Sequence, residues 1–273
     1  MGRINNVSFP SLGLDFTFSE TITIPFTKIE IFWYAIIIAT GMTVAGLIGW
    51  REYKKAGKTG DDLCDFLLFA LPLGILGARL YYVIFRWDLY KDNLSEIFAI
   101  WNGGLAIYGG IIAGAIVAII YTRVKKYPFL WFADVASFGL FIAQSMGRWG
   151  NFINAEAYGG PTDLPWGMVV NGVGPVHPTF LYESLWNITG FLVSYFIIRR
   201  VKKTDGLCFA YYLIWYGIGR FFIEGLRSDS LYLFGDVRVS QVVAFISVLL
   251  GIFALIYVKF IKKEQISEGN VTV

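Results

Sequence analysis

One short stretch of the chain holds the side chains best suited to chemistry. A long apolar run ends at Met146, and Arg148 follows it almost directly. Two asparagines, a glutamate and four glycines lie with this arginine between Gly147 and Gly160. The planar fork of an arginine donates two parallel hydrogen bonds, which suits it to phosphate. If the apolar run spans a bilayer, Arg148 lies at its rim, where the phosphates of lipid head groups lie.

Other charged residues fall inside apolar segments or near their ends: Arg79, Glu183, Arg220, Glu224 and Arg227. A charge within a membrane costs about 2.5–3.5 kcal/mol on insertion scales, so each of these residues is a functional candidate. The spacing of Arg220, Glu224 and Arg227 places them on one helix face, where they could simply pair with one another. We expect instead an excess of arginine over carboxylate at one depth, which favours an anionic ligand.

The composition indicates that these residues are positioned by membrane helices. The chain has 273 residues, 56% of them hydrophobic and 16% charged, whereas soluble domains carry about 25% charged residues. Seven apolar segments each approach the roughly 20 residues that a spanning helix needs. They cover residues 29–50, 63–85, 103–121, 129–146, 179–198, 206–222 and 239–258. We therefore expect an all-α polytopic membrane protein with seven transmembrane helices.

The distribution of basic residues predicts the orientation. Most lysines and arginines lie in alternate connections, at residues 51–58, 123–126, 199–203 and 259–263. The positive-inside rule assigns these connections to the cytoplasm, so the N-terminus lies outside and the C-terminus is cytoplasmic. We expect a single integral-membrane domain over residues 1–273, in which residues 147–178 form a small extracytoplasmic cap. Residues 1–28 are expected to lie on the membrane surface.

Other kinds of site have little support in the sequence. With two cysteines and one histidine, the chain shows no metal-binding motif, so we expect no metal and no cofactor. Cys64 and Cys208 fall at predicted inner helix ends, in a reducing compartment, so we expect neither a disulfide nor a catalytic thiol there. The basic residues lie in loops and form no stripe on a soluble domain, so nucleic acid is not an expected partner. His177 precedes a proline and is expected to hydrogen-bond at a helix start.

The opening stretch reads Gly147-Arg148-x-Gly-Asn151-Phe-Ile-Asn154-x-Glu156-x-x-Gly159. This pattern resembles the signature of the prolipoprotein diacylglyceryl transferases of bacteria. Shorter matches run through the chain: Trp33-Tyr34, Gly77-Ala-Arg79, Trp101-Asn-Gly-Gly-Leu-Ala-Ile-Tyr108-Gly-Gly, His177-Pro-Thr-Phe-Leu-Tyr182-Glu183-Ser and Gly219-Arg220-Phe-Phe-Ile-Glu224-x-x-Arg227. The family also has seven spans and an external N-terminus, as the loop charges predict for this chain.

The resemblance implies an enzyme and its partners. Members of this family move the diacylglyceryl group of phosphatidylglycerol onto the thiol of the lipobox cysteine in a prolipoprotein signal peptide. A thioether forms and glycerol phosphate leaves, which is the first step of bacterial lipoprotein maturation. The implied location is the bacterial cytoplasmic membrane, within the lipid bilayer, with the active site facing the extracytoplasmic leaflet.

The resemblance also implies roles for particular residues. The implied catalytic residues are Arg148, Arg220, Glu224 and Tyr108, with both arginines on the lipid phosphate. The implied substrate-binding residues are Arg148, Asn151, Gly159, Tyr34, Arg227 and Glu156. Some family members carry a histidine where this chain has Tyr108, and a tyrosine is a poor base at neutral pH. The acceptor of the thiol proton therefore stays open among Glu156, Glu183, His177 and Tyr108.

Two other functions fit parts of the pattern. A transporter of an anionic lipid or metabolite would also use buried arginines. It should show internal repeats and charges at the membrane midplane, and neither is visible in this sequence. A purely structural membrane scaffold would leave Arg148 and Glu224 unexplained.

Overall fold

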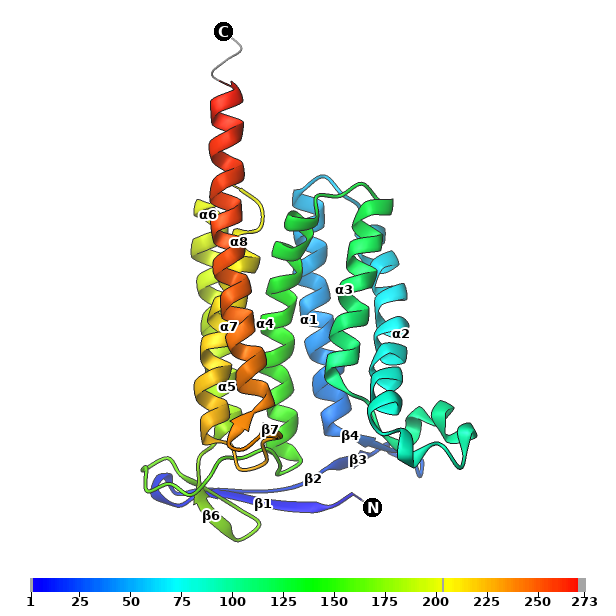
Figure 1. Ribbon diagram of the computed structural model, residues 1–273. Helices are drawn as coiled ribbons and strands as arrows, with labels where there is room; N and C mark the ends of the chain where they lie inside the picture. Colours follow the sequence, from blue (N-terminus) through cyan, green and yellow to red (C-terminus); the bar gives the residue numbers. More distant parts are fainter. Residues whose placement is uncertain (1, 203, 270–273) are drawn as a thin grey trace. The chain divides into compact units, whose positions relative to one another are not determined.

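The computed structural model describes residues 2–202 and 204–269, so Lys203 of the predicted basic loops lies outside the described residues. Figure 1 follows the chain from strand β1 to helix α8. The chain divides into two compact units, one of them formed by Trp50–Phe132 and the other by the residues before and after it. Helices α1 (Trp33–Lys55) and α4 (Phe129–Ile153) each contain a boundary between the units.

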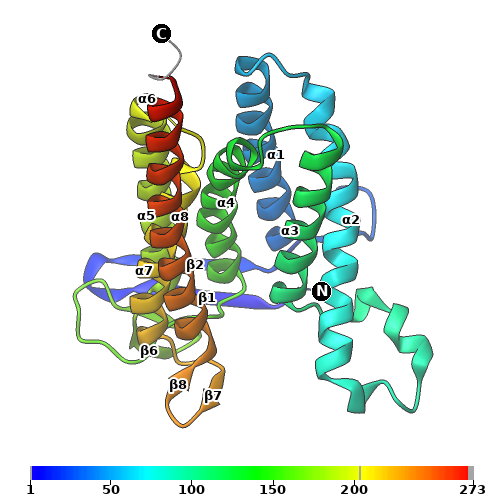
Figure 2. The same cartoon turned by 45° about the horizontal axis from the view of Figure 1, so that its top comes forward.

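In the first unit, α5 and α7 pack against α4, and α8 packs along α7. After α4 come α5 (Thr179–Leu192), a π-helical segment (Val193–Ile198), α6 (Arg199–Val201), α7 (Leu207–Leu226) and α8 (Val239–Gly269). Phe138 and Phe141 of α4 share a buried cluster with Phe191 of α5 and Tyr212 of α7. Figures 1 and 2 show α7 beside α8 along their length. This packing brings α4, α5 and α7 together.

A small antiparallel sheet completes the first unit and corrects the all-α expectation. Its order is β2-β1-β5-β6, formed by β2 (Leu14–Ser19), β1 (Ile4–Phe9), β5 (Met168–Val170) and β6 (Val173–Val176). Val7 and Phe9 of β1 pack with Met168, Val170 and Phe180 in a second buried cluster. The N-terminal residues and the predicted cap thus form one sheet, and the chain is mostly helical.

Two short hairpins accompany the larger sheet. Strands β3 (Thr21–Thr23) and β4 (Glu30–Phe32) pair directly before α1. Strands β7 (Tyr232–Phe234) and β8 (Val237–Arg238) connect α7 to α8. Much of residues 1–28 is paired strand, and the expected position of this segment on the membrane surface stays a prediction.

The second unit is a helical hairpin with an irregular connection. Its helices are α2 (Gly60–Phe85) and α3 (Ile107–Val124), joined through short 3₁₀ turns at Trp87–Leu89, Leu94–Phe98 and Ile100–Asn102. Where they pack, a Cβ added to Gly109 would lie 2.2 Å from the carbonyl oxygen of Gly77. Any larger residue at this position would therefore push the two helix backbones apart.

Each predicted apolar segment lies largely within a helix, although the helix ends differ from the predicted segment ends. Among the described residues, five helices are long and apolar enough to cross a membrane: α1, α2, α3, α4 and the part of α8 over Val239–Phe260. This is the pattern of a polytopic membrane protein, and the number of spans stays a prediction. Helix α4 ends at Ile153, seven residues beyond the predicted end, so the first residues of the expected cap are helical.

Candidate functional site

Glu183 is the centre of a buried charged cluster in the first unit. Its side chain is 3% exposed and lies near the start of α5. One carboxylate oxygen, Oε1, accepts from Arg148 Nη2 of α4 at 2.6 Å. The other, Oε2, accepts from Arg220 Nη1 of α7 at 2.9 Å. One carboxylate therefore holds two guanidinium groups, carried by two different helices, side by side.

Arg148 is oriented by a second set of contacts. Its Nη1 donates to Asn151 Oδ1 at 3.0 Å, across one turn of α4. Asn151 Nδ2 in turn donates to Glu156 Oε1 at 3.0 Å, and Asn154 Nδ2 donates to the same oxygen at 3.2 Å. The continuation of α4 to Ile153 makes this possible, because residues three apart on a helix share a face. Asn151 and Glu156 thus fix the direction of Arg148.

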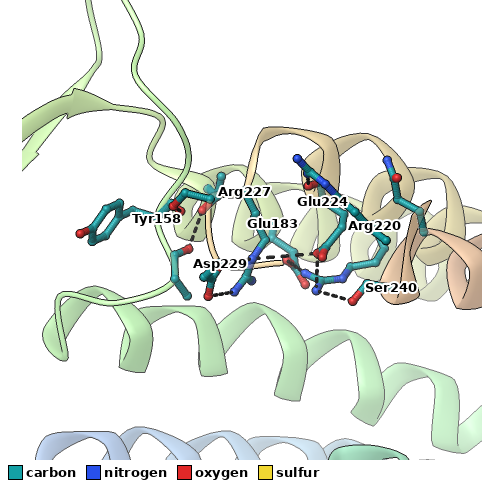
Figure 3. Close-up of polar contacts among 12 residues, drawn as sticks. Tyr158, Glu183, Arg220, Glu224, Arg227, Asp229 and Ser240 are labelled. Carbon is teal, nitrogen blue, oxygen red and sulfur yellow. Dashed lines mark hydrogen bonds and ion pairs between the residues drawn. The ribbon is translucent and has the colours of Figure 1, made fainter. Parts of the chain in front are cut away.

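Glu224 holds Arg220 from the other side, as Figure 3 shows. Glu224 is 2% exposed, and its Oε2 lies 2.6 Å from Arg220 Nη2, in an ion pair outside hydrogen-bond geometry. Arg220 Nη2 also donates to Ser240 Oγ of α8 at 3.3 Å. Arg238 Nη1 donates to the backbone carbonyl of Glu224. Residues of α5, α7 and α8 therefore position one guanidinium.

The helical spacing of Arg227 and Glu224 allowed them to pair, and the structure gives Arg227 a nearer partner. Its Nε is 3.9 Å from Glu224 Oε2, a distant ion pair. It makes a two-fold contact with Asp229, from Nε to Oδ1 at 3.0 Å and from Nη2 to Oδ2 at 2.8 Å (Figure 3). The main partner of Arg227 is thus Asp229, just beyond the end of α7.

The charge balance of this cluster contradicts the expected arginine excess. Three of its arginines, Arg148, Arg220 and Arg227, contact acidic or carboxamide side chains, and Arg238 contacts the backbone carbonyl of Glu224; its carboxylates are Glu156, Glu183, Glu224 and Asp229. Each of the first three arginines has a carboxylate or a carboxamide within hydrogen-bond distance. The distinctive feature of the cluster is therefore its geometry, in which buried carboxylates keep like-charged arginines together.

Gly159 serves close packing in this structure. Its N–H donates to the carbonyl of His177 at 2.9 Å, and Gly160 N–H donates to that of Leu226 at 2.8 Å. A Cβ on Gly159 would lie 2.6 Å from the Cβ of His177 and 2.8 Å from the carbonyl oxygen of Leu226. Glycine here lets the cap segment run between the end of α7 and the start of α5.

Tyr34 lies beside the same end of α4. A Cβ added to Gly150 would be 2.3 Å from Cδ2 of the Tyr34 ring, so the ring packs directly on that glycine. Tyr34 keeps 37% of its surface exposed. Gly150 precedes Asn151 in the chain, so the structure places Tyr34 close to the residues that orient Arg148.

The small sheet fastens the end of α4, a connection that sequence reasoning missed. Asn5 of β1 is fully buried, and its Nδ2 donates to the carbonyl of Ile153, the last residue of α4, at 2.9 Å. Its Oδ1 accepts from Asn171 Nδ2 at 3.1 Å. The alternation of apolar residues over residues 12–18, and at Val7 and Phe9, was the available signal for these strands.

Two remaining candidates, Tyr108 and His177, make other contacts. Tyr108 lies in the first turn of α3 in the second unit, near the Tyr81 ring at a centroid distance of 6.4 Å. The cluster around Glu183 is formed by residues of the first unit. His177 Nδ1 lies 3.4 Å from the hydroxyl of Tyr182, which also accepts from Trp166 Nε1 at 2.7 Å. His177 is thus part of a polar contact at the start of α5, as its position before a proline predicted.

Comparison with known proteins assigns the chain to a family. Residues 21–257 match the family described as prolipoprotein diacylglyceryl transferase. A phosphatidylglycerol–prolipoprotein diacylglyceryl transferase of Clostridioides difficile is 48% identical over 240 residues, which is 88% of this chain and 96% of that protein. A protein of the same name from Streptococcus uberis is 46% identical, covering 87% of this chain and 94% of its own length. The chain belongs to the prolipoprotein diacylglyceryl transferase family.

Proposed function

We propose that this protein transfers the diacylglyceryl group of phosphatidylglycerol to the cysteine thiol of prolipoproteins. Its relatives are named phosphatidylglycerol–prolipoprotein diacylglyceryl transferases. The observation that carries the proposal is the bridge Arg148–Glu183–Arg220, in which one buried carboxylate holds two guanidinium groups. In the proposed reaction, the cysteine sulfur attacks a glyceryl carbon and the carbon–oxygen bond to phosphate breaks. The electron pair leaves with glycerol phosphate.

The bridge suits the charge that develops in this reaction. Two arginines at one point would repel each other, and the carboxylate of Glu183 removes that repulsion while holding both in place. Each guanidinium has five N–H donors, and only part of this capacity is used by the contacts within the cluster. Donors fixed before the reaction stabilise a leaving phosphate without further reorganisation. The side chains of Arg148 and Arg220 remain 22% and 14% exposed.

The other candidate residues take supporting roles in this proposal. Asn151 and Glu156 orient Arg148, while Glu224 holds Arg220 and Arg227 extends the cluster. Gly159 allows the cap segment to close over the end of α7, and Tyr34 lines the lipid site.

The proton of the thiol must be lost before attack, because the thiolate is the nucleophile. Glu183 is poorly suited to accept it, since both of its oxygens already accept from guanidinium groups. The nearby arginines would stabilise the thiolate directly and its proton passes to solvent water, so the proposal does not require a dedicated base. Proton removal is then a smaller contribution to the rate than stabilisation of the leaving phosphate.

The proposal includes an arrangement in the membrane. Seven helices span the bacterial cytoplasmic membrane, with the N-terminus outside and the C-terminus in the cytoplasm. Residues 1–273 form one integral-membrane domain with residues 147–178 as its extracytoplasmic cap, and the site faces the extracytoplasmic leaflet. The charge of alternate loops supports this orientation. So does the sheet that joins the cap segment to the N-terminal strands, because both must then lie on one side.

Lysine substitutions at the two bridging arginines test the function. Arg148→Lys and Arg220→Lys keep the charge and lose the planar fork. We expect each to lower transfer from phosphatidylglycerol to a lipobox peptide about 100-fold, as for removal of one preorganised donor. Thioether product is measured by mass spectrometry with purified full-length protein.

Arg123→Lys is the matched control, because Arg123 is an exposed arginine at the end of α3. Near-normal transfer by both bridge variants would contradict the role of the bridge. Wild-type protein that moves a labelled lipid across vesicles and forms no thioether would contradict the enzyme and favour transport.

A further inference from the structure

Helices α5 and α7 carry the same short pattern, a tryptophan followed four residues later by a glycine. In α5 it is Trp186-x-x-x-Gly190, and in α7 it is Trp215-x-x-x-Gly219. The two indoles are stacked, with ring centroids 4.4 Å apart and an interplanar angle of 21°. Trp186 Nε1 donates to the carbonyl of Trp215 at 2.8 Å, and Trp215 Nε1 donates to the carbonyl of Trp186 at 2.9 Å. The contact is therefore reciprocal, each helix offering the same donor and acceptor to the other.

The glycines make the reciprocal contact possible. A Cβ added to Gly219 would lie 2.2 Å from Trp186 Nε1, and one added to Gly190 would lie 2.6 Å from Trp215 Nε1. Each indole thus lies flat on the partner helix, on the glycine that follows the partner tryptophan by one turn. In a helix, a carbonyl is bonded to the N–H four residues on. Trp186 donates to the Trp215 carbonyl, which within α7 points toward the N–H of Gly219. Trp215 donates to the Trp186 carbonyl, which within α5 points toward the N–H of Gly190.

The reciprocal contact lies next to the charged bridge. Glu183 is three residues before Trp186, and Arg220 directly follows Gly219. The two helices contact one another at successive levels, through Glu183 with Arg220 and through Trp186 with Trp215. A shift of α5 along α7 by one residue moves a side chain by about 1.5 Å and rotates it by about 100°. Such a shift would separate Glu183 from Arg220.

We propose that the two Trp-x-x-x-Gly sequences form an interlock that sets the register of α5 against α7, and that Trp186, Trp215, Gly190 and Gly219 are positioning residues for the Glu183–Arg220 contact. None of them needs to touch the lipid or the peptide. Stacked rings alone could slide past each other. Two hydrogen bonds to backbone atoms, one in each direction, fix the position of α5 along α7. The effect of the interlock on the transfer rate rests on the proposed function, whereas the contact between the two helices does not.

A suppressor experiment tests the interlock. Gly219→Ala places a methyl group against the Trp186 indole and is expected to lower kcat about 100-fold, the scale of an ångström-sized misplacement. KM for phosphatidylglycerol should change much less. In a Trp186→Leu background the methyl group has no indole to displace, so Gly219→Ala should cause no further loss. Transfer to a lipobox peptide and the thermal unfolding midpoint are measured for wild type, both single variants and the double variant.

Gly46→Ala in α1 is the matched control, because a Cβ there would meet no atom within 4 Å. Its kcat and unfolding midpoint should equal those of wild type. Equal losses from Gly219→Ala in both backgrounds, or a wild-type kcat in the single variant, would overturn the interlock. A loss of rate that only follows the fraction of folded protein would overturn its positioning role.

Two further measurements separate the possible failures. If Gly219→Ala does not fold, Trp215→Phe keeps a stacked ring and removes one N–H, and it should lower kcat with little change in KM. A wild-type protein that forms no thioether contradicts the proposed function and leaves the unfolding midpoints to decide on the interlock. Those midpoints should show the same non-additivity between Trp186 and Gly219 that contacting residues show; additive midpoints would overturn the contact itself.

Discussion

Each of the two units holds arginines within the last two turns of a helix, and the partners of these arginines differ. In the second unit, Arg79 is 5% exposed and donates to backbone carbonyls of the connection between α2 and α3. Its acceptors are the carbonyls of Ile97 at 2.9 Å, Gly103 at 2.7 Å, Gly104 at 3.1 Å, Glu96 at 2.5 Å and Ala99 at 3.5 Å. In the first unit, Arg148 and Arg220 donate to one carboxylate.

This difference separates a structural arginine from a candidate catalytic one. Carbonyls that come from one connection use nearly all the donors of Arg79, so its guanidinium fastens that connection. The Arg79 guanidinium also lies over the Tyr90 ring, 5.0 Å from its centroid. Arg148 and Arg220 share an acceptor from a third helix and keep exposed surface. The position of an arginine in an apolar helix is thus insufficient to identify a functional site. The chemical type of its partners, and the segments that supply them, distinguish a structural arginine from a candidate catalytic one.

The largest effect that would test this comparison is expected from Glu183→Gln. A neutral amide leaves two guanidinium groups together without the anion that holds them. Removing one partner of a buried ion pair costs about 3–5 kcal/mol of stability, and we expect a loss in this range together with loss of transfer activity. Denaturant unfolding of the purified protein measures the stability. Glu96→Gln, at an exposed glutamate, is the control. A loss below about 1 kcal/mol would show that Glu183 does not hold the cluster.

Arg79→Lys should have a smaller effect and of a different kind. Lysine has three donors on a single nitrogen and cannot reach the set of carbonyls that the fork of Arg79 reaches. We expect a loss of about 2 kcal/mol in unfolding free energy, since buried carbonyls lose their donors. The rate of transfer per folded molecule should stay within about threefold of wild type.

The same substitution at Arg148 or Arg220 should lower the rate far more than the stability. The three lysine variants therefore form one matched series, measured by unfolding and by transfer. A rate loss in Arg79→Lys as large as in Arg220→Lys would remove the distinction between the two units. It would indicate that the second unit also contributes a charged group to the reaction.

The sequence predicts the helices well because their signal is local. Every predicted apolar segment lies largely in helix, since length and hydropathy can be read without knowing what packs against what. The predicted end of α4 was seven residues too early, because polar residues such as Arg148 and Asn151 after an apolar run are typical of a loop. Their side chains find partners from other segments, Glu183 and Glu156, and these polar contacts allow the helix to continue.

The sheet and the charge balance could not be found in the same way. Asn5 reaches Ile153, and Val7 pairs with Val170, across more than a hundred residues of intervening chain. Strand pairing at such separation depends on the folded helices that bring the segments together. The expected excess of arginine counted residues by depth, and it overlooked Asp229 and Glu156, which lie beyond the helix ends and still reach the cluster. Glu183 was noticed as a candidate base, and its bridging position required the packing of α4, α5 and α7.

Arg227 has a third kind of partner, the partly exposed carboxylate of Asp229, and we expect the smallest change in stability from removing it. Burial raises the pKa of Asp229, but the hydrogen bonds and charge of Arg227 outweigh it, so its pKa lies below the ordinary value. A carboxyl with a lowered folded-state pKa contributes stability above its unfolded pKa of about 4 and loses it as pH falls through the folded value. Because the Asp229 side chain is 48% exposed, the contribution should be about 0.5 kcal/mol.

Asp229→Asn should therefore lower the unfolding free energy by this small amount at pH 7, and by the same amount down to about pH 5. Below about pH 4 the two proteins should converge, because the wild-type carboxyl then becomes protonated and loses its ion pair. Unfolding free energies of both proteins, measured in parallel across this pH range, show the convergence. A difference that stays constant to the lowest pH would mean that Asp229 acts through its hydrogen bonds alone. A difference as large as that from Glu183→Gln would place Arg227 with the buried bridge, because an exposed carboxylate cannot contribute as much as one that shares two guanidinium groups away from water.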